Sequence, residues 1–215
     1  DQLLEFYPDN IGVRERLIDL YTKLKQPERA EKQLEEIRKH SRPGDPGRQA
    51  LGLIYLKQGK LDESIEELKL IVSAWPDDDK SRYYLATAYT QKGETDEAMD
   101  HFSRVRPQSK YYVNARTHMA YLLETQERHA EAIKILEELI AAKEKKPEIY
   151  LMLASVYEAM NDYDKAMAVV KEGLEQHSRN VDLIFRRGVI LDKKGDKEGC
   201  IQQMQSVLEI EPDHA

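Results

Sequence analysis

The sequence predicts an all-α fold, a solenoid of tandem 34-residue helix–turn–helix repeats. Three observations carry this prediction: a fixed period, apolar residues at helical spacing, and turn residues between the helices. The period is visible in LATAY at residues 85–89, which follows LGLIY at 51–55 by 34 residues. The related motif LASVY follows it at 153–157, another 68 residues along the chain.

The first helix of each repeat is predicted from apolar residues at its seventh, eighth and eleventh positions, as at Leu85, Ala86 and Tyr89. The second helix is predicted from the twentieth, twenty-fourth and twenty-seventh positions, which are Ala98, Phe102 and Val105 in the same repeat. Both spacings place apolar side chains on one helical face. Small residues in the eighth and twentieth columns would let the two helices of a hairpin approach closely.

A turn is predicted at the fifteenth position of the repeat. Glycine and asparagine are common there, and both tolerate the left-handed conformation that ends helices. The examples are Gly59, Gly93, Asn161 and Gly195.

The period fixes the expected boundaries along the chain. These are the second half of a truncated repeat at 1–10, and full repeats at 11–44, 45–78, 79–112, 113–146, 147–180 and 181–214. Residues 1–10 match the end of a repeat, and Ala215 is the first position of another. We therefore expect one continuous domain that is a fragment of a longer array.

Composition excludes several classes of protein. The formal net charge is −7, whereas nucleic-acid binders usually show a basic surface, so no nucleic-acid partner is expected. No segment approaches the roughly 18 consecutive apolar residues of a membrane span. A single cysteine excludes a disulfide within the chain. The sequence leaves the compartment undecided: the cytoplasm is slightly favoured and the periplasm stays open.

This pattern resembles the tetratricopeptide repeat family, which has the same period and similar Leu-Gly, Tyr, Ala, Phe and Pro positions. The resemblance implies a right-handed α-α superhelix whose first helices line a concave surface that binds peptides or proteins. No tryptophan occupies the fourth column, and Arg187 replaces an apolar residue in the seventh. Pro107 is expected to shorten the second helix of the third repeat.

The resemblance further implies that the second, fifth, ninth and twelfth positions of each repeat face this groove, and the candidates below come from the fifth and ninth. Large apolar groups on a solvent-lined surface need covering, and aromatic anchors often carry binding energy. The alternative is that the aromatic residues pack against neighbouring helices. The residues expected to bind a partner are Tyr83, Thr87, Thr117, Tyr121, Leu151, Ser155, Phe185 and Val189.

The fourth column contains four arginines, one in each of the first four repeats: Arg14, Arg48, Arg82 and Arg116. Such a ladder could recognise an acidic partner, because guanidinium groups pair with carboxylates. The favoured alternative is pairing within the chain, with the stems lying over apolar surface.

No catalytic residues, metal site or cofactor are predicted. The glycine and lysine at Gly59-Lys60 lack the spacing and the following Ser or Thr of a phosphate loop. The carboxylates of Asp77, Asp78 and Asp79 are expected to cap a helix and not to bind a metal.

The predicted function is a protein–protein interaction scaffold or adaptor that binds a peptide or partner protein in the groove. One alternative is a non-catalytic repeat region of a larger enzyme or assembly protein, whose activity lies outside these residues. Another is a structural spacer that uses its ends. The last predicted helix carries apolar residues with no following helix to cover them, so end-to-end self-association is also expected. These residues are Ile201, Met204, Val207 and Leu208.

Overall fold

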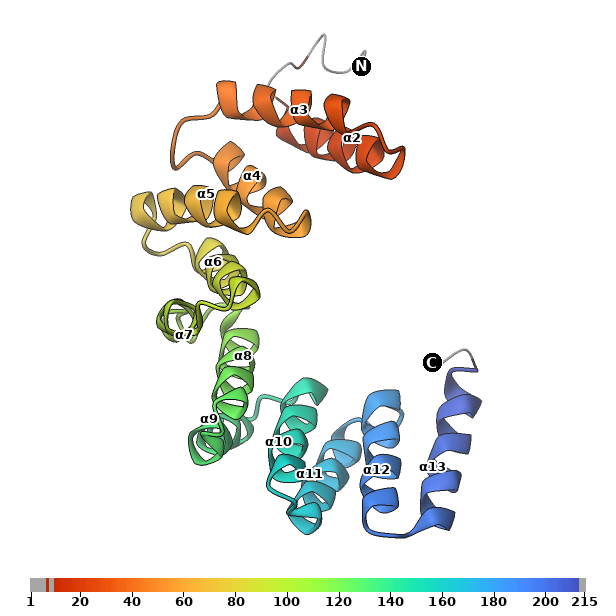
Figure 1. Ribbon diagram of the computed structural model, residues 1–215. Helices are drawn as coiled ribbons and strands as arrows, with labels where there is room; N and C mark the ends of the chain where they lie inside the picture. Colours follow the sequence, from red (N-terminus) through yellow and green to blue (C-terminus); the bar gives the residue numbers. More distant parts are fainter. Residues whose placement is uncertain (1–6, 8–9, 213–215) are drawn as a thin grey trace. The chain divides into compact units, whose positions relative to one another are not determined.

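The structure is a computed structural model that describes residue 7 and residues 10–212. Helices make up all of the regular secondary structure of these residues (Figure 1), so the all-α prediction is confirmed. Most of the predicted half-repeat at 1–10 lies outside the described residues. The helices are α2 (Ile11–Lys23), α3 (Pro27–Lys39), α4 (Pro46–Lys57), α5 (Leu61–Ala74), α6 (Asp79–Lys92), α7 (Thr95–Ser103), α8 (Tyr112–Thr125), α9 (His129–Ala141), α10 (Pro147–Ala159), α11 (Tyr163–Gln176), α12 (Val181–Lys193) and α13 (Lys197–Ile210).

The chain divides into two compact units, Asp1–Tyr112 and Val113–Ala215. In unit 1, α2 packs against α3, α4 against α5 and α6 against α7. In unit 2, α10 packs against α11 and α12 against α13. The first helices of successive pairs also contact each other. Helix α4 contacts both α2 and α6, and α10 contacts α12. The helices therefore form paired helix–turn–helix repeats, as the period predicts.

Small residues lie at the contact between the two helices in most hairpins, whereas the first hairpin has the buried Ile18 in the eighth column. Ala98, Ala132 and Ala166 of the twentieth column are completely buried. At Gly52 of the eighth column, an added Cβ would lie 2.7 Å from Leu68 Cγ, so only glycine fits without repacking. The larger apolar residues fill the space around these contacts.

The turn between the two helices adopts a left-handed backbone in every repeat. The fifteenth-column φ angles are 55° at Lys25, 72° at Gly59, 84° at Gly93, 60° at Glu127, 58° at Asn161 and 85° at Gly195. Lys25 and Glu127 were not expected there, because a side chain makes this conformation unfavourable. The helix packing on both sides therefore imposes the turn even where the local sequence opposes it.

The second helix of the third repeat is short, as expected from Pro107. Helix α7 has 9 residues and ends at Ser103, whereas the other helices have 12 to 14. The chain that follows is tied back to the start of α6, because Arg106 Nε donates to Asp79 Oδ2 at 3.0 Å.

The fourth-column arginines bond within the chain, which confirms the favoured interpretation. Their partners and donor–acceptor distances are Gln33 for Arg14 (2.7 Å), Glu67 for Arg48 (2.7 Å), the Pro76 carbonyl for Arg82 (2.5 Å) and Glu138 for Arg116 (3.0 Å). Glu67 is buried and lies 3.5 Å from Arg38 as well. Arg14, Arg48 and Arg116 therefore join the two helices of their own hairpins, whereas Arg82 binds the loop that precedes α6.

Replacing Glu127 by glycine is expected to raise the free energy of unfolding by about 0.5–1 kcal/mol. Glycine adopts the left-handed conformation without steric cost, and this gain exceeds the entropy it loses on folding. Urea denaturation measures the change. The matched control Glu127→Ala removes the same carboxylate but keeps a Cβ, so it should show no gain. A Glu127→Gly protein no more stable than Glu127→Ala would contradict the backbone explanation.

His101 is expected to make stability depend on pH. Its ring stacks on that of Tyr89, with ring centroids 5.6 Å apart, and its buried Nδ1 has no hydrogen-bond partner among the described residues. Burial lowers the pKa of His101 below its ordinary value of 6.5. The unfolded chain therefore binds the proton more readily, and the folded state should lose stability as the pH falls below about 6.5.

The free energy of unfolding measured on both sides of this pH tests the effect. His101→Gln should flatten part of the decline seen in the unmodified protein. His118 is half-buried and its pKa is also lowered by burial, so some dependence should persist in the variant. An unchanged pH profile in His101→Gln would contradict the assignment.

Candidate functional site

In unit 1, the fifth and ninth positions of α6 are Tyr83 and Thr87, both half-buried. The ring of Tyr83 stacks on that of Tyr111 and meets that of Tyr84 edge-on, both with centroids 5.3 Å apart. It also lies 5.7 Å from the ring of Phe102. Tyr83 therefore belongs to a packed aromatic cluster, as the alternative interpretation of the aromatic residues held.

The two threonines of the predicted site are bonded to their own helices. Thr87 Oγ1 donates to the Tyr83 carbonyl at 3.0 Å, and Thr117 Oγ1 donates to the Val113 carbonyl at 2.9 Å. A hydroxyl engaged in this way can still accept a hydrogen bond from a partner. These side chains suit polar contacts along an apolar surface.

In unit 2, two of the predicted residues are well exposed although they are aromatic. Tyr121 on α8 is 48% exposed and Phe185 on α12 is 42% exposed. The remaining members are half-buried: Leu151 and Ser155 on α10, and Val189 on α12. Because α10 contacts α12, these helices present neighbouring faces. Unit 2 thus places most of the predicted residues on successive first helices.

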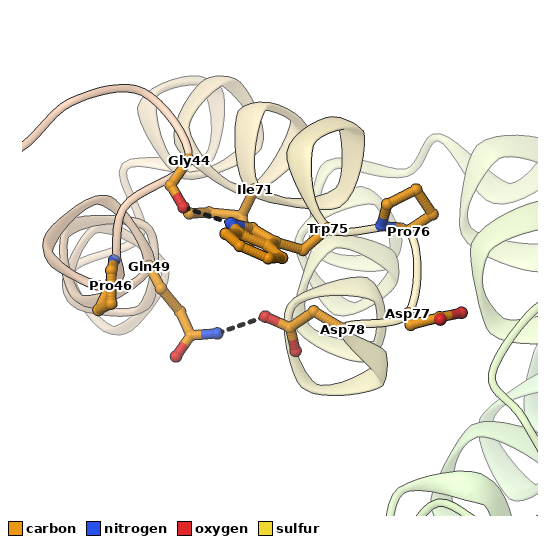
Figure 2. A pocket seen from close by; sticks show the side chains of 8 residues that line it. All are labelled: Gly44, Pro46, Gln49, Ile71, Trp75, Pro76, Asp77 and Asp78. Atoms are coloured by element: carbon orange, nitrogen blue, oxygen red, sulfur yellow. Dashed lines mark hydrogen bonds between the residues drawn. The ribbon is translucent and has the colours of Figure 1, made fainter.

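A pocket in unit 1 was not predicted from the sequence. It has a volume of about 500 Å³ and lies between the segment that leads into α4 and the loop that joins α5 to α6 (Figure 2). Its lining residues are Gly44, Pro46, Gln49, Ile71, Trp75, Pro76, Asp77 and Asp78. Gln49 occupies a fifth position, so the pocket adjoins a first-helix face.

The indole of Trp75 is the largest exposed group of this pocket, and the side chain is 62% exposed. Its Nε1 donates to the Gly44 carbonyl at 2.8 Å. Trp75 is the chain's single tryptophan, and its column holds Tyr7, Ser41, Ser109, Lys143, His177 and Glu211 in the other repeats. The available sequence signal was therefore the single tryptophan and not the column in which it stands.

Of the three aspartates that were predicted to cap a helix, Asp78 provides the side-chain cap. Asp78 Oδ1 accepts from the Ser81 amide at 3.1 Å and so caps α6. Asp77 and Asp79 instead form ion pairs with Arg106, at 3.1 Å and 3.0 Å. Nearby, burial raises the pKa of Tyr111, and the negative charge of Asp78 adds to the effect.

Among residues 7 and 10–212, no helix has the length and apolar character needed to cross a bilayer. The compartment stays a prediction.

Three models described as tetratricopeptide repeat match residues 50–113, 123–180 and 181–214, which together cover more than half of the chain. Among curated proteins, DnaJ homolog subfamily C member 3 of Gallus gallus is 24% identical over 163 residues, which are 76% of this chain and 29% of the relative. The TPR repeat-containing protein PA4667 of Pseudomonas aeruginosa is 23% identical over 141 residues, 64% of this chain and 23% of the relative. The chain thus matches less than a third of either relative's length.

Solved structures share the fold at low sequence identity. A tetratricopeptide repeat protein from Parabacteroides merdae has a TM-score of 0.69 and 18% identity, over 93% of this chain and 79% of that one. MamA from Desulfovibrio magneticus RS-1 has a TM-score of 0.62 and 18% identity, over 78% and 94%. YrrB, described as a TPR protein with an unusual peptide-binding site, has a TM-score of 0.56 and 15% identity, over 84% and 93%.

At these identities the solved structures support the fold alone. The 34-residue period, the paired helices and the three matching models agree with one another. The chain belongs to the tetratricopeptide repeat family.

Proposed function

We propose that this chain is a scaffold or adaptor that binds a peptide or partner protein along its first-helix faces. The observation that carries the proposal is the exposure of Tyr121 and Phe185, at 48% and 42%. Large aromatic side chains at such positions can anchor a partner at low entropic cost, and burying them releases water from apolar surface. On this proposal the chain acts by binding and not by catalysis.

Half-buried residues would complete the contact surface of unit 2. Leu151 and Val189 add apolar area, while Ser155 and Thr117 offer hydroxyl groups. In unit 1, Thr87 has the same role, and Tyr83 contributes the exposed part of its aromatic cluster. A surface of this composition suits a protein or peptide, and the net charge of −7 opposes a nucleic acid.

The chain aligns with less than a third of the length of each of these two curated relatives, which supports a second form of the proposal. In that form the repeats are the non-catalytic, partner-binding region of a larger enzyme or assembly protein.

Another surface supports self-association. Ile201 and Leu208 on α13 are 56% and 52% exposed, and this helix buries only Gln203 and Val207 below a tenth of their area. We propose that a second copy of the chain covers this apolar side of α13.

Substituting both aromatic residues of unit 2 is expected to abolish partner capture. The double variant Tyr121→Ala and Phe185→Ala removes the two exposed anchors, and hot-spot truncations often cost 2 kcal/mol or more, about thirtyfold in affinity. Capture from a lysate, followed by mass spectrometry, measures the loss. Tyr83 is left unchanged because its packed cluster makes any substitution a stability change.

The matched control is Leu70→Ala with Met160→Ala, which removes similarly exposed apolar groups (37% and 46%) outside the predicted site. Equal helicity of all three proteins by circular dichroism is required. A partner captured equally well by the aromatic variant and the control would contradict a role for the first-helix faces.

Self-association through α13 predicts a concentration-dependent mass. Light scattering should show dimers of the unmodified chain at high concentration, and Leu208→Lys should remain monomeric because a charge on this surface opposes burial. Leu70→Lys serves as the control on another second helix. A monomeric mass for the unmodified chain at every concentration would contradict the proposal.

A further inference from the structure

The pocket at Trp75 has a fixed aromatic wall. The hydrogen bond from Trp75 Nε1 to the Gly44 carbonyl, at 2.8 Å, ties the indole to the loop of the preceding hairpin (Figure 2). Gly44 has a φ of +89°, and a Cβ there would lie 2.8 Å from Ala74 Cβ. Only glycine therefore allows the two segments to meet. A preformed wall costs a ligand less entropy than one that must be ordered on binding.

The opposite side of the pocket carries fixed carboxylate oxygens. Asp78 accepts hydrogen bonds from the Ser81 amide, the Ser81 hydroxyl and Gln49 Nε2, at 3.1, 2.9 and 2.7 Å. All three donors are neutral, so they orient the carboxylate without cancelling its charge. In Figure 2 the Gln49–Asp78 bond lies on the other side of the indole from Gly44.

Charge complementarity identifies the occupant. The eight lining residues include two aspartates and no lysine or arginine, and the nearby Lys80 ammonium is engaged with Gln49 Oε1 at 3.1 Å. The side chain of Asp77 is 85% exposed, although one of its oxygens pairs with Arg106 at 3.1 Å. An indole face attracts cations within about 6 Å of the ring, and arginine and lysine have apolar stems that suit Pro46 and Pro76.

The volume of the pocket indicates how much of a peptide ligand it can hold. A space of about 500 Å³ is larger than one side chain, so neighbouring residues of the same segment also have room. Gln49 lines the pocket and is the fifth position of the second repeat, on the face of α4 proposed to bind partners. An extended segment crossing this face of unit 1 could place one side chain in the pocket.

We propose that this pocket binds an arginine or lysine side chain from an extended segment of a partner protein. The cation lies against the indole of Trp75 and near the carboxylate of Asp78, with Asp77 at the rim of the pocket. This inference rests on the proposed function, since it names the partner's chemistry at one site beside the first-helix face of unit 1.

The test uses short capped peptides of glycine and proline with one central residue, which is arginine, lysine, glutamine or glutamate. Binding to the whole chain is measured by anisotropy of a fluorescent label. The nuclear magnetic resonance signal of the indole N–H locates the peptide, because the chain contains a single tryptophan. The arginine and lysine peptides should bind about tenfold more tightly than the glutamine peptide, and the glutamate peptide should bind most weakly.

Two variants examine the carboxylates. Asp77→Asn and Asp78→Asn should each reduce the preference for arginine over glutamine, and asparagine at position 78 preserves the helix cap. The matched control is Asp162→Asn, because Asp162 caps α11 in unit 2 by accepting from the Lys165 amide. This control should bind all four peptides as the unmodified chain does.

Equal binding of the arginine and glutamine peptides would overturn the proposal and identify an apolar, proline-binding pocket. Tighter binding of the glutamate peptide, or no change in the indole signal with any peptide, would also overturn it. A protein partner lost by the Tyr121 and Phe185 variant would still support the proposed function in these cases. The two ideas therefore fail separately.

Discussion

The close approach of the two helices in each hairpin is the constraint on which the structure depends. In the second repeat, the buried Ser64 hydroxyl donates to the Gly52 carbonyl at 2.8 Å, directly across this contact. A glycine and a serine in these columns allow the bond, and alanine fills the serine's column in other repeats. Larger residues would separate the helices and remove the surface against which the next hairpin packs.

The same constraint bears on the proposed binding surface of the first helices. The eighth and eleventh positions are used for packing within and between hairpins, and the proposed contacts are therefore drawn from the fifth and ninth positions, among which Tyr83 is itself partly packed. The arginines of the fourth column come directly before the fifth position in the sequence, and they bond within the chain. Arg48 reaches inward to buried Glu67, and its neighbour Gln49 reaches outward to Asp78. Adjacent residues on one helix thus serve stability and the candidate pocket.

Much of the fold could be predicted from the sequence, because a fixed period constrains every repeat at once. The helix pairs and the turns at Gly59 and Gly93 follow from it, and the short α7 follows from Pro107. The turns at Lys25 and Glu127 could not be predicted by residue type, since packing overrides local preference there. Likewise, the columns placed Tyr83 on a helix face but could not show its stacking on Tyr111, which comes from an irregular loop.

The Trp75 pocket could not be predicted from the sequence, because it too depends on contacts made by loops. It depends on a hydrogen bond between residues 31 positions apart, in two segments between helices for which the period predicts no contact. Loops between repeats vary more freely than helices, because fewer packing contacts restrict them. Sites built from such loops can be found from a structure, whereas sites on the helices can be found from the columns.

The pairing of helices with their sequence neighbours has a consequence for how the chain loses its order. The helix contacts within each unit join segments close in sequence, so loop closure costs little and structure can form locally. Heating or mild denaturant can then melt one group of hairpins while another keeps its internal contacts. Such a chain unfolds in steps as the temperature or denaturant concentration rises. A partner that binds several repeats at once would stabilise them together, so that they unfold in a single cooperative transition.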